Sequence, residues 1–316
     1  MVCNVLCSSG DSLAAGYSNG LIKWWRTAST SLEELKSSKP FSFLLDSPID
    51  ALRIIGSILV VGMDGKVLFY MHPSEAQLSE TCPEPFYRIT LPQTIPSFSG
   101  ALLPASVSSL TYIPSLHCLF IGMCTPMLPY SVICYSLVDP MEPQHMWHGL
   151  ENFSVSSMLF VKSRMELLVG SVGKLIVINL SDDWSKITVS SEFKIVEDDS
   201  RLSTITSINQ ISDGLIAVSF LGGYVAFCLS DNFSPFKIIS FPFLIRNSVL
   251  FNNSLFVAGN SDTTALITVD GEVDTFIKVE YPVFSSVHVT NIGLIVPSND
   301  ELLIVEEPRI VIDKIK

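Results

Sequence analysis

The chain has 316 residues, of which 48% are hydrophobic and 16% are charged, and its formal net charge is −12. This hydrophobic content excludes an intrinsically disordered chain and predicts a large core. The acidic surplus, with no run of Lys or Arg, argues against direct binding to nucleic acid and against docking on an anionic membrane.

The absence of recognisable targeting signals and the scattered cysteines both indicate an intracellular protein. No apolar stretch reaches the ~20 residues that a membrane helix needs, and the N-terminus lacks the basic flank and apolar run of a signal peptide. The seven cysteines are scattered, mostly inside apolar runs, and are predicted to be buried, reduced thiols. We therefore expect an intracellular protein, either cytoplasmic or nuclear.

A recurrent pair of apolar runs joined by a short turn organises the chain. Residues 57–71, SILVVGMDGKVLFYM, show it most clearly, because Asp64-Gly65 between two apolar runs is typical of a tight β-hairpin. Further copies lie at residues 12–25, 165–180, 215–229, 254–269 and 293–307, and at 117–137 with the insert CTPMLPY at residues 124–130.

Each hairpin is flanked by further strand-like segments. A β-branched residue opens a short segment before it, as at Ile49 and Val107, and another apolar segment often follows it, as in residues 236–241. The repeating unit is thus four antiparallel strands. The mean period between Gly16 and Pro297 is about 47 residues, close to the ~40–45 of a WD-type propeller blade.

The central runs of each unit are apolar throughout instead of alternating, which indicates burial on both faces. A parallel sheet covered by helices would also bury both faces, but the helix-like segments, residues 32–35 and 74–80, are too short and too few. The sequence therefore predicts an all-β fold, a seven-bladed β-propeller of four-stranded antiparallel blades. We expect a single domain over 1–316, with blades at approximately 1–47, 48–92, 107–149, 154–196, 204–242, 246–281 and 284–316.

Residues 16–26, GYSNGLIKWWR, resemble the strand–turn–strand ending of a WD repeat. Trp25 falls at the family's Trp position, Arg26 replaces its Asp, and no Gly-His pair opens any blade. The resemblance is one of architecture and turn spacing over nearly the whole chain, to a divergent WD-repeat (WD40-like) β-propeller, and other propeller families of the same blade shape stay open. It implies a non-catalytic protein–protein interaction scaffold, a subunit of an intracellular multiprotein complex.

The chain carries few signs of chemistry. There is no G-x-S-x-G nucleophile elbow, and GSVGK at residues 170–174 is expected to be a β-turn. His145 and His148 form an H-x-x-H, but zinc needs three or four ligands. We expect no catalytic residue, no metal and no cofactor. The alternative is a propeller enzyme, or a regulatory subunit of one, with carboxylates or histidines converging on the central channel.

Two neighbouring segments of blade three are unusual for loops, because they are apolar: the link at residues 92–106 and the insert at 124–130. Their apolar residues either pack on one another or form an exposed patch that marks an interaction site. An acidic segment before blade five would lie on the same face as a polar rim. We expect one or more protein partners to dock across blades three to five through Phe98, Leu102, Leu103, Met127, Leu128, Tyr130, Glu197, Asp198 and Asp199.

The two ends of the chain predict ring closure without a strand swap. CNVLCS at residues 3–8 can supply the inner strand of the first blade, and RIVIDKIK at 309–316 the outer strand of the last. Each blade would then be complete from its own repeat. The first and last blades would meet through side-chain packing alone, at a weaker seam.

Overall fold

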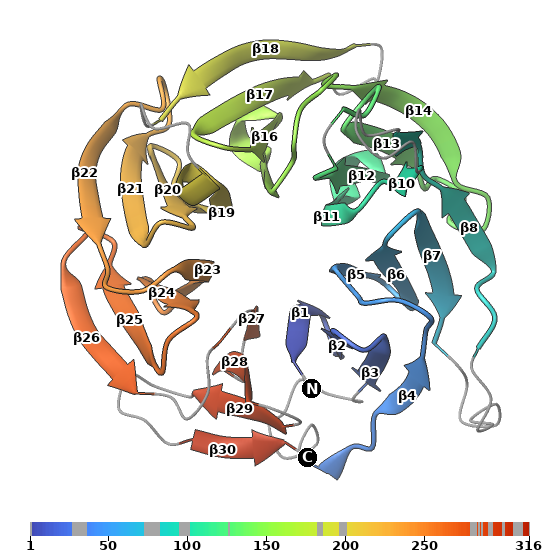
Figure 1. The fold of residues 1–316 in the computed structure, drawn as a ribbon, viewed down its shortest axis with the longest axis horizontal. Helices are drawn as coiled ribbons and strands as arrows, with labels where there is room; N and C mark the ends of the chain where they lie inside the picture. Colours follow the sequence, from blue (N-terminus) through green and yellow to red (C-terminus); the bar gives the residue numbers. More distant parts are fainter. Residues whose placement is uncertain are drawn as a thin grey trace.

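The computed structural model describes residues 2–26, 37–72, 83–94, 102–125, 127–181, 186–195, 201–278, 283, 285, 287–289, 293–298, 301–305 and 312–315. Its antiparallel sheets stand around a central axis like the blades of a propeller, each with its first strand nearest the axis and its fourth strand outside (Figure 1).

Six four-stranded sheets have side chains that are described along most of their length. The first three are β1 (Cys3–Ser9), β2 (Ser12–Tyr17), β3 (Leu21–Arg26) and β4 (Phe41–Leu44); β5 (Ala51–Ile55), β6 (Ile58–Met63), β7 (Lys66–Met71) and β8 (Tyr87–Thr90); and β11 (Val107–Ile113), β12 (Cys118–Met123), β13 (Val132–Ser136) and β14 (Gln144–Gly149).

The next three are β15 (Ser157–Val161), β16 (Glu166–Gly170), β17 (Lys174–Leu180) and β18 (Ile187–Lys194); β19 (Ile205–Ser212), β20 (Leu215–Phe220), β21 (Tyr224–Leu229) and β22 (Pro235–Ser240); and β23 (Ile245–Phe251), β24 (Ser254–Gly259), β25 (Thr263–Thr268) and β26 (Val273–Lys278). We number these six blades 1 to 6 in chain order.

The expectation of a seven-bladed propeller needs correction. Blades 1 to 6 match the predicted unit, whereas the last sheet is described mainly through its backbone: β27 (Val287–Val289), β28 (Gly293–Ser298), β29 (Glu301–Val305) and β30 (Ile312–Ile315). Its first strand has only three residues, and Pro297 inside β28 has no backbone N–H to donate to the ladder. The structure thus describes six complete blades and one reduced sheet that fills the remaining sector.

Burial on both faces explains the continuous apolar runs of the sequence. Every residue of β2, β6 and β12 is buried, because each of these strands is sandwiched between the neighbouring sheets. The apolar clusters of the core lie between blades. One of them joins Trp24 of blade 1 to Leu52, Leu59 and Tyr70 of blade 2.

The ring closes without an exchange of strands. The strand order is β1-β2-β3-β4 in the first sheet and β27-β28-β29-β30 in the last, and the two sheets lie side by side (Figure 1). Cys3, Leu13 and Trp25 of blade 1 pack with Ile295 and Leu302 of the last sheet. One hydrogen bond adds to this packing, because the Leu6 amide donates to the Ser285 hydroxyl at 2.9 Å.

Within the described residues, no helix is long and apolar enough to span a membrane.

Candidate functional site

One face of the ring carries both the turns between second and third strands and the links from one blade to the next. Backbone hydrogen bonds tie the two together: Leu45 N donates to Gly20 O, Gly65 N to Ala105 O, and Phe241 N to Gly223 O. Gly65 has a φ of +75°, as the predicted Asp-Gly turn requires. We call this surface the loop face.

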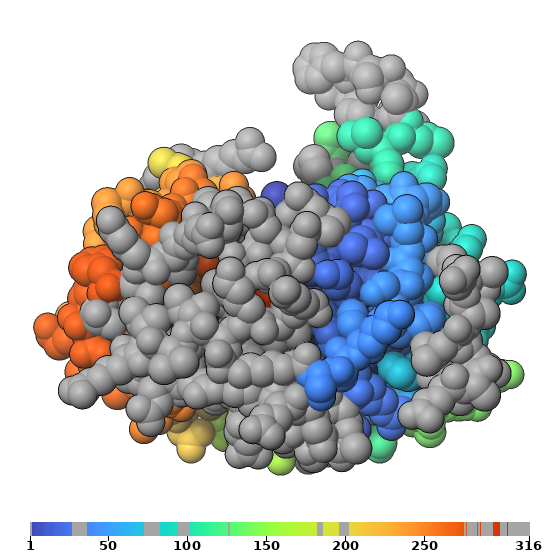
Figure 2. Space-filling view, turned by 90° about the horizontal axis from the view of Figure 1, so that it is seen from below, coloured from blue at the N-terminus to red at the C-terminus, as the bar shows by residue number. Residues whose placement is uncertain are grey.

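A two-stranded ribbon, β9 (Gln93–Thr94) and β10 (Leu103–Pro104), stands on the loop face in the link before blade 3. It rises above the body of the ring (Figure 2). Leu102 and Leu103, at its second strand, are 58% and 42% exposed. The ribbon is a separate pair of strands that belongs to no blade, and it carries apolar side chains into solvent.

The insert after β12 lies directly beside this ribbon. Thr125 Oγ1 accepts a hydrogen bond from Ser106 N at 2.7 Å and donates to Pro104 O at 3.3 Å. Met127, at the tip of the insert, is 58% exposed with a positive φ of 60°. The two unusual segments of blade 3 therefore lie side by side, and each exposes apolar side chains. We call Leu102, Leu103 and Met127 the apolar ridge.

Leu128 and Tyr130 take different positions from the one predicted for them. Leu128 is fully buried in the cluster between blades 2 and 3, so it anchors the insert and offers nothing to a partner. Tyr130 is half-buried against the same cluster and lies over the His148 ring, with 4.5 Å between ring centroids. Leu128 is thus no part of the exposed surface, because a core lies within its reach, whereas Tyr130 stays partly exposed beside it.

The other predicted contact residues, Phe98, Glu197, Asp198 and Asp199, lie outside the described residues.

Next to the apolar ridge, two carboxylates on the loop face lie close together. Asp50 is in the link before β5, and Asp64 is in the turn between β6 and β7. Burial, and then the nearby charge of Asp64, raises the pKa of Asp50 from 3.8 to about 6. Cys124 at the base of the insert has its pKa raised by burial and also by these two carboxylates. The positive charge of Lys66 is engaged by Asp46, at 2.9 Å.

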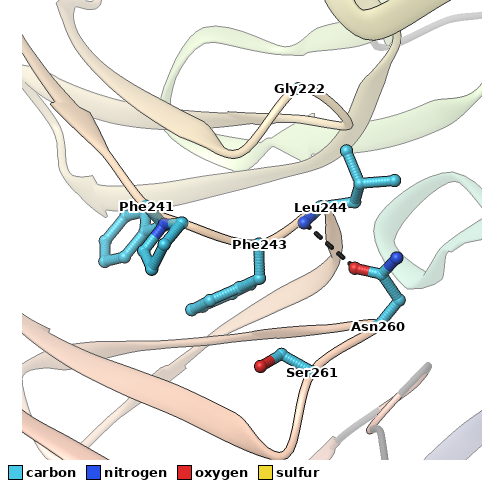
Figure 3. Close-up of a pocket in the computed structure, with 7 residues that line it drawn as sticks. Gly222, Phe241, Phe243, Leu244, Asn260 and Ser261 are labelled. Atoms are coloured by element: carbon cyan, nitrogen blue, oxygen red, sulfur yellow. Dashed lines mark hydrogen bonds between the residues drawn. The ribbon is translucent and has the colours of Figure 1, made fainter.

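A pocket opens on the same face on the other side of the ring, between blades 5 and 6. The link Phe241–Leu244 forms its floor, and Gly222, Asn260 and Ser261 from two turns form its walls (Figure 3). Its volume is about 440 Å³. Asn260 fixes the link in place, because its side-chain oxygen accepts a hydrogen bond from Leu244 N at 3.0 Å.

Among the residues that the structure describes, no group of three or more His, Cys, Asp or Glu is arranged to hold a metal ion. His145 and His148 lie on the outer strand β14 of blade 3, and both are exposed. The arrangement on the loop face is suited to binding: apolar side chains are exposed to solvent, an anionic pair lies beside them, and a pocket opens across the ring.

No protein-family model and no curated protein matches this sequence. Solved structures do match it. The WD40 β-propeller domain of Doa1 superposes with a TM-score of 0.68 at 13% identity, over 95% of this chain and 90% of that chain. Sqt1 of Saccharomyces cerevisiae superposes with a TM-score of 0.61 at 12% identity, over 95% of this chain and 92% of that chain. The chain has the WD40 propeller fold.

The WD40-like features of the sequence take recognisable places in this fold. Trp25 is buried at the seam with the last sheet. Arg26, which replaces the Asp of a WD pair, turns outward and forms an ion pair with Asp11 at 3.6 Å. Trp25 thus packs in the core as the Trp of a WD pair would, while Arg26 forms a surface ion pair.

Two features of this propeller were missed from the sequence. The pocket was signalled by Phe-Pro-Phe at residues 241–243, an aromatic link directly before a predicted inner strand. The Asp50–Asp64 pair was signalled only by two separate acidic residues, 14 positions apart. Their proximity depends on the hydrogen bond of Asp50 N to Gly62 O, which brings link and strand end together.

Proposed function

We propose that this chain is a non-catalytic protein–protein interaction scaffold, a subunit of an intracellular multiprotein complex, and that its partner docks on the loop face. The observation that carries the proposal is the apolar ridge. Exposed apolar side chains gathered on a raised part of a monomer surface are typical of an interaction site, and loops on a rigid scaffold are where binding residues concentrate.

The surroundings of the ridge define the chemistry of the partner. Asp50 and Asp64 have no cation among their described contacts, while the Lys66 amine is already engaged by Asp46. A partner segment with an apolar residue next to Lys or Arg would cover the ridge and compensate the anionic pair. Charge complementarity of this kind raises association rates and selects among partners. The chain's net charge of −12 favours a basic partner in the same way.

The test compares two exposed methionines of blade 3 that lie on opposite faces of the ring. Met127 belongs to the ridge, and Met141, 48% exposed, lies in the β13–β14 turn on the other face. Stable complexes would be purified from the native cells with tagged wild type, Met127→Asp and Met141→Asp, and quantified by mass spectrometry. Asp is tolerated at the positive φ of Met127.

We expect Met127→Asp to lose at least about 90% of the specific partner, because a charge buried in an apolar contact costs more than about 1.4 kcal/mol, a factor of ten in affinity. Met141→Asp should retain the partner, and both variants should have the melting temperature of wild type. If both variants lose the partner, or if neither does, the partner does not dock on the apolar ridge.

The alternative, a propeller enzyme or a regulatory subunit with its site at the central channel, is not favoured by any specific observation in the described part of the chain. The proposal includes no direct binding of nucleic acid and no membrane docking, and the acidic surplus supports both statements.

A further inference from the structure

The two histidines of β14 lie on the same face of their sheet, although their spacing of three residues predicts opposite faces. Residues three apart in a regular strand point to opposite faces. In β14 a β-bulge intervenes: His145 pairs with Tyr135 and His148 pairs with Ile133, with the register shift between them. Because Tyr135 and Ile133 are two apart on β13, their partners share a face.

Two nitrogens of the rings lie within hydrogen-bonding distance, which is also close to the separation of two nitrogen ligands on one metal ion. His148 Nδ1 lies 3.4 Å from His145 Nε2, so one nitrogen donates to the other in the metal-free protein, and the ring centroids are 5.4 Å apart. In tetrahedral coordination with metal–nitrogen bonds of about 2.0–2.1 Å, two ligand nitrogens lie about 3.3–3.4 Å apart. The side chains are exposed, so a metal ion and its water ligands can reach the pair.

Two tyrosines hold these rings in position. Tyr130 lies against the His148 ring, at 4.5 Å between centroids and an interplanar angle of 39°. Tyr135 meets the His145 ring edge-on, at 5.6 Å and 80°. Both tyrosines are half-buried against the cluster between blades 2 and 3, so they are fixed by the core. Ligands restrained in this way lose little conformational freedom on binding.

We propose that His145 and His148 form a surface site for one first-row divalent transition-metal ion, such as Ni(II), Cu(II) or Zn(II). Neutral imidazole is a preferred ligand for these ions. Two protein ligands leave the remaining coordination positions to water, so the site is open and its affinity is moderate. The proposal is independent of the docking function, because it concerns β14 and needs no partner.

The experiment uses the untagged full chain and Ni(II) alone, titrated by isothermal calorimetry at pH 7.5. Wild type should bind one equivalent with a dissociation constant in the micromolar range. His145→Gln and His148→Gln should each weaken binding at least about tenfold, since even the loss of an outer-shell partner of a ligand costs that much. Binding should also weaken on acidification, because both imidazoles must be neutral to coordinate.

The matched control is His117→Asn. His117 is an exposed histidine of the same blade, in the turn between β11 and β12. Its backbone is left-handed, with a φ of 48°, a conformation that Asn also adopts. This variant should bind Ni(II) like wild type. Circular dichroism checks folding, and the two Gln variants provide independent tests should one fold poorly. Absence of binding by wild type, or equal binding by all variants, would overturn the proposal.

Discussion

At the scale of single residues, Asp50 is the clearest case of a side chain that does not stabilise the fold. Burial and the charge of Asp64 raise its pKa from 3.8 to about 6. Between these values the folded state binds a proton that the unfolded chain has released, so this carboxyl makes the protein less stable as the pH rises from about 4 to 6, and the cost persists above pH 6. A partly buried carboxylate without a counter-charge is a typical feature of a surface adapted for binding.

Asp50→Asn is therefore expected to stabilise the protein at pH 7.5 by about 1 kcal/mol, after allowance for solvent screening of a group that is not fully buried. The gain should vanish near pH 4, where Asp50 is protonated in the folded state. Urea unfolding at the two pH values measures this difference. Asp64→Asn should give a smaller gain, because it removes the repulsion and leaves the burial. A loss of stability in Asp50→Asn at pH 7.5 would mean that the ionised carboxylate has a favourable contact.

At the scale of elements, adjacent blades fit together through a glycine in one and a β-branched residue in the next. A Cβ built on Gly62 would lie 2.5 Å from Val107 Cγ1, and one on Gly122 would lie 2.5 Å from Val155 Cγ1. Gly16 meets Ile49 in the same way. The β-branched residue that opens each repeat thus fills the space which the preceding blade leaves at its glycine, and the contact sets the spacing between blades.

Gly62→Ala should cost about 1–3 kcal/mol, because the added methyl overpacks this contact. Val107→Ala in the same chain should recover part of that loss, giving a double mutant less destabilised than the sum of the two single changes. Gly214→Ala is the control, since a methyl group there would meet nothing within 4 Å and its φ is not positive. Denaturant unfolding of the four variants gives the coupling energy, and strict additivity would refute the contact.

At the scale of the whole molecule, the seam between blade 1 and the last sheet differs from the junctions among blades 1 to 6, because one side of it is the reduced sheet, whose first strand has only three residues. It is bridged by apolar packing and by the hydrogen bond from Leu6 N to Ser285 Oγ, with no shared strand. Each strand of blades 1 to 6 is paired within its own sheet, so opening at the seam breaks no ladder. We expect β1–β4 to open before the central blades in native-state hydrogen exchange.

Ser285→Ala tests this seam. Leu6 N would be left buried without an acceptor, at a cost of about 1–3 kcal/mol, and the exchange of the Leu6 amide should accelerate. Ser156→Ala is the control, because Ser156 Oγ donates to Gly170 O at 3.0 Å inside blade 4, away from the seam. That variant should leave the seam unchanged. Uniform protection around the ring in wild type would contradict a weaker seam.

The local units of this protein follow from its amino-acid sequence alone. The strands and hairpins of blades 1 to 6 were predicted from apolar runs, from Asp-Gly and Asn-Gly turns and from the β-branched residues that open each repeat. These features are local, because a turn and a strand buried on both faces each depend on the types of consecutive residues. The same patterns indicated that blade 3 carries unusual apolar segments on one face. The last repeat was wrongly predicted to be a seventh blade like the others, although Pro297 inside its strand marked it as irregular.

What the loops present to solvent depends on the packing of the blades. Leu128 and Met127 are adjacent and both apolar, yet one is fully buried and the other 58% exposed, because the core between blades 2 and 3 accepts one side chain at that position. The Asp50–Asp64 pair and the facing histidines of β14 are brought together by strand pairing and a β-bulge inside one blade, and the pocket by the packing of blades 5 and 6. Such proximities arise only when the strands pair and the sheets pack, and a linear pattern does not contain them.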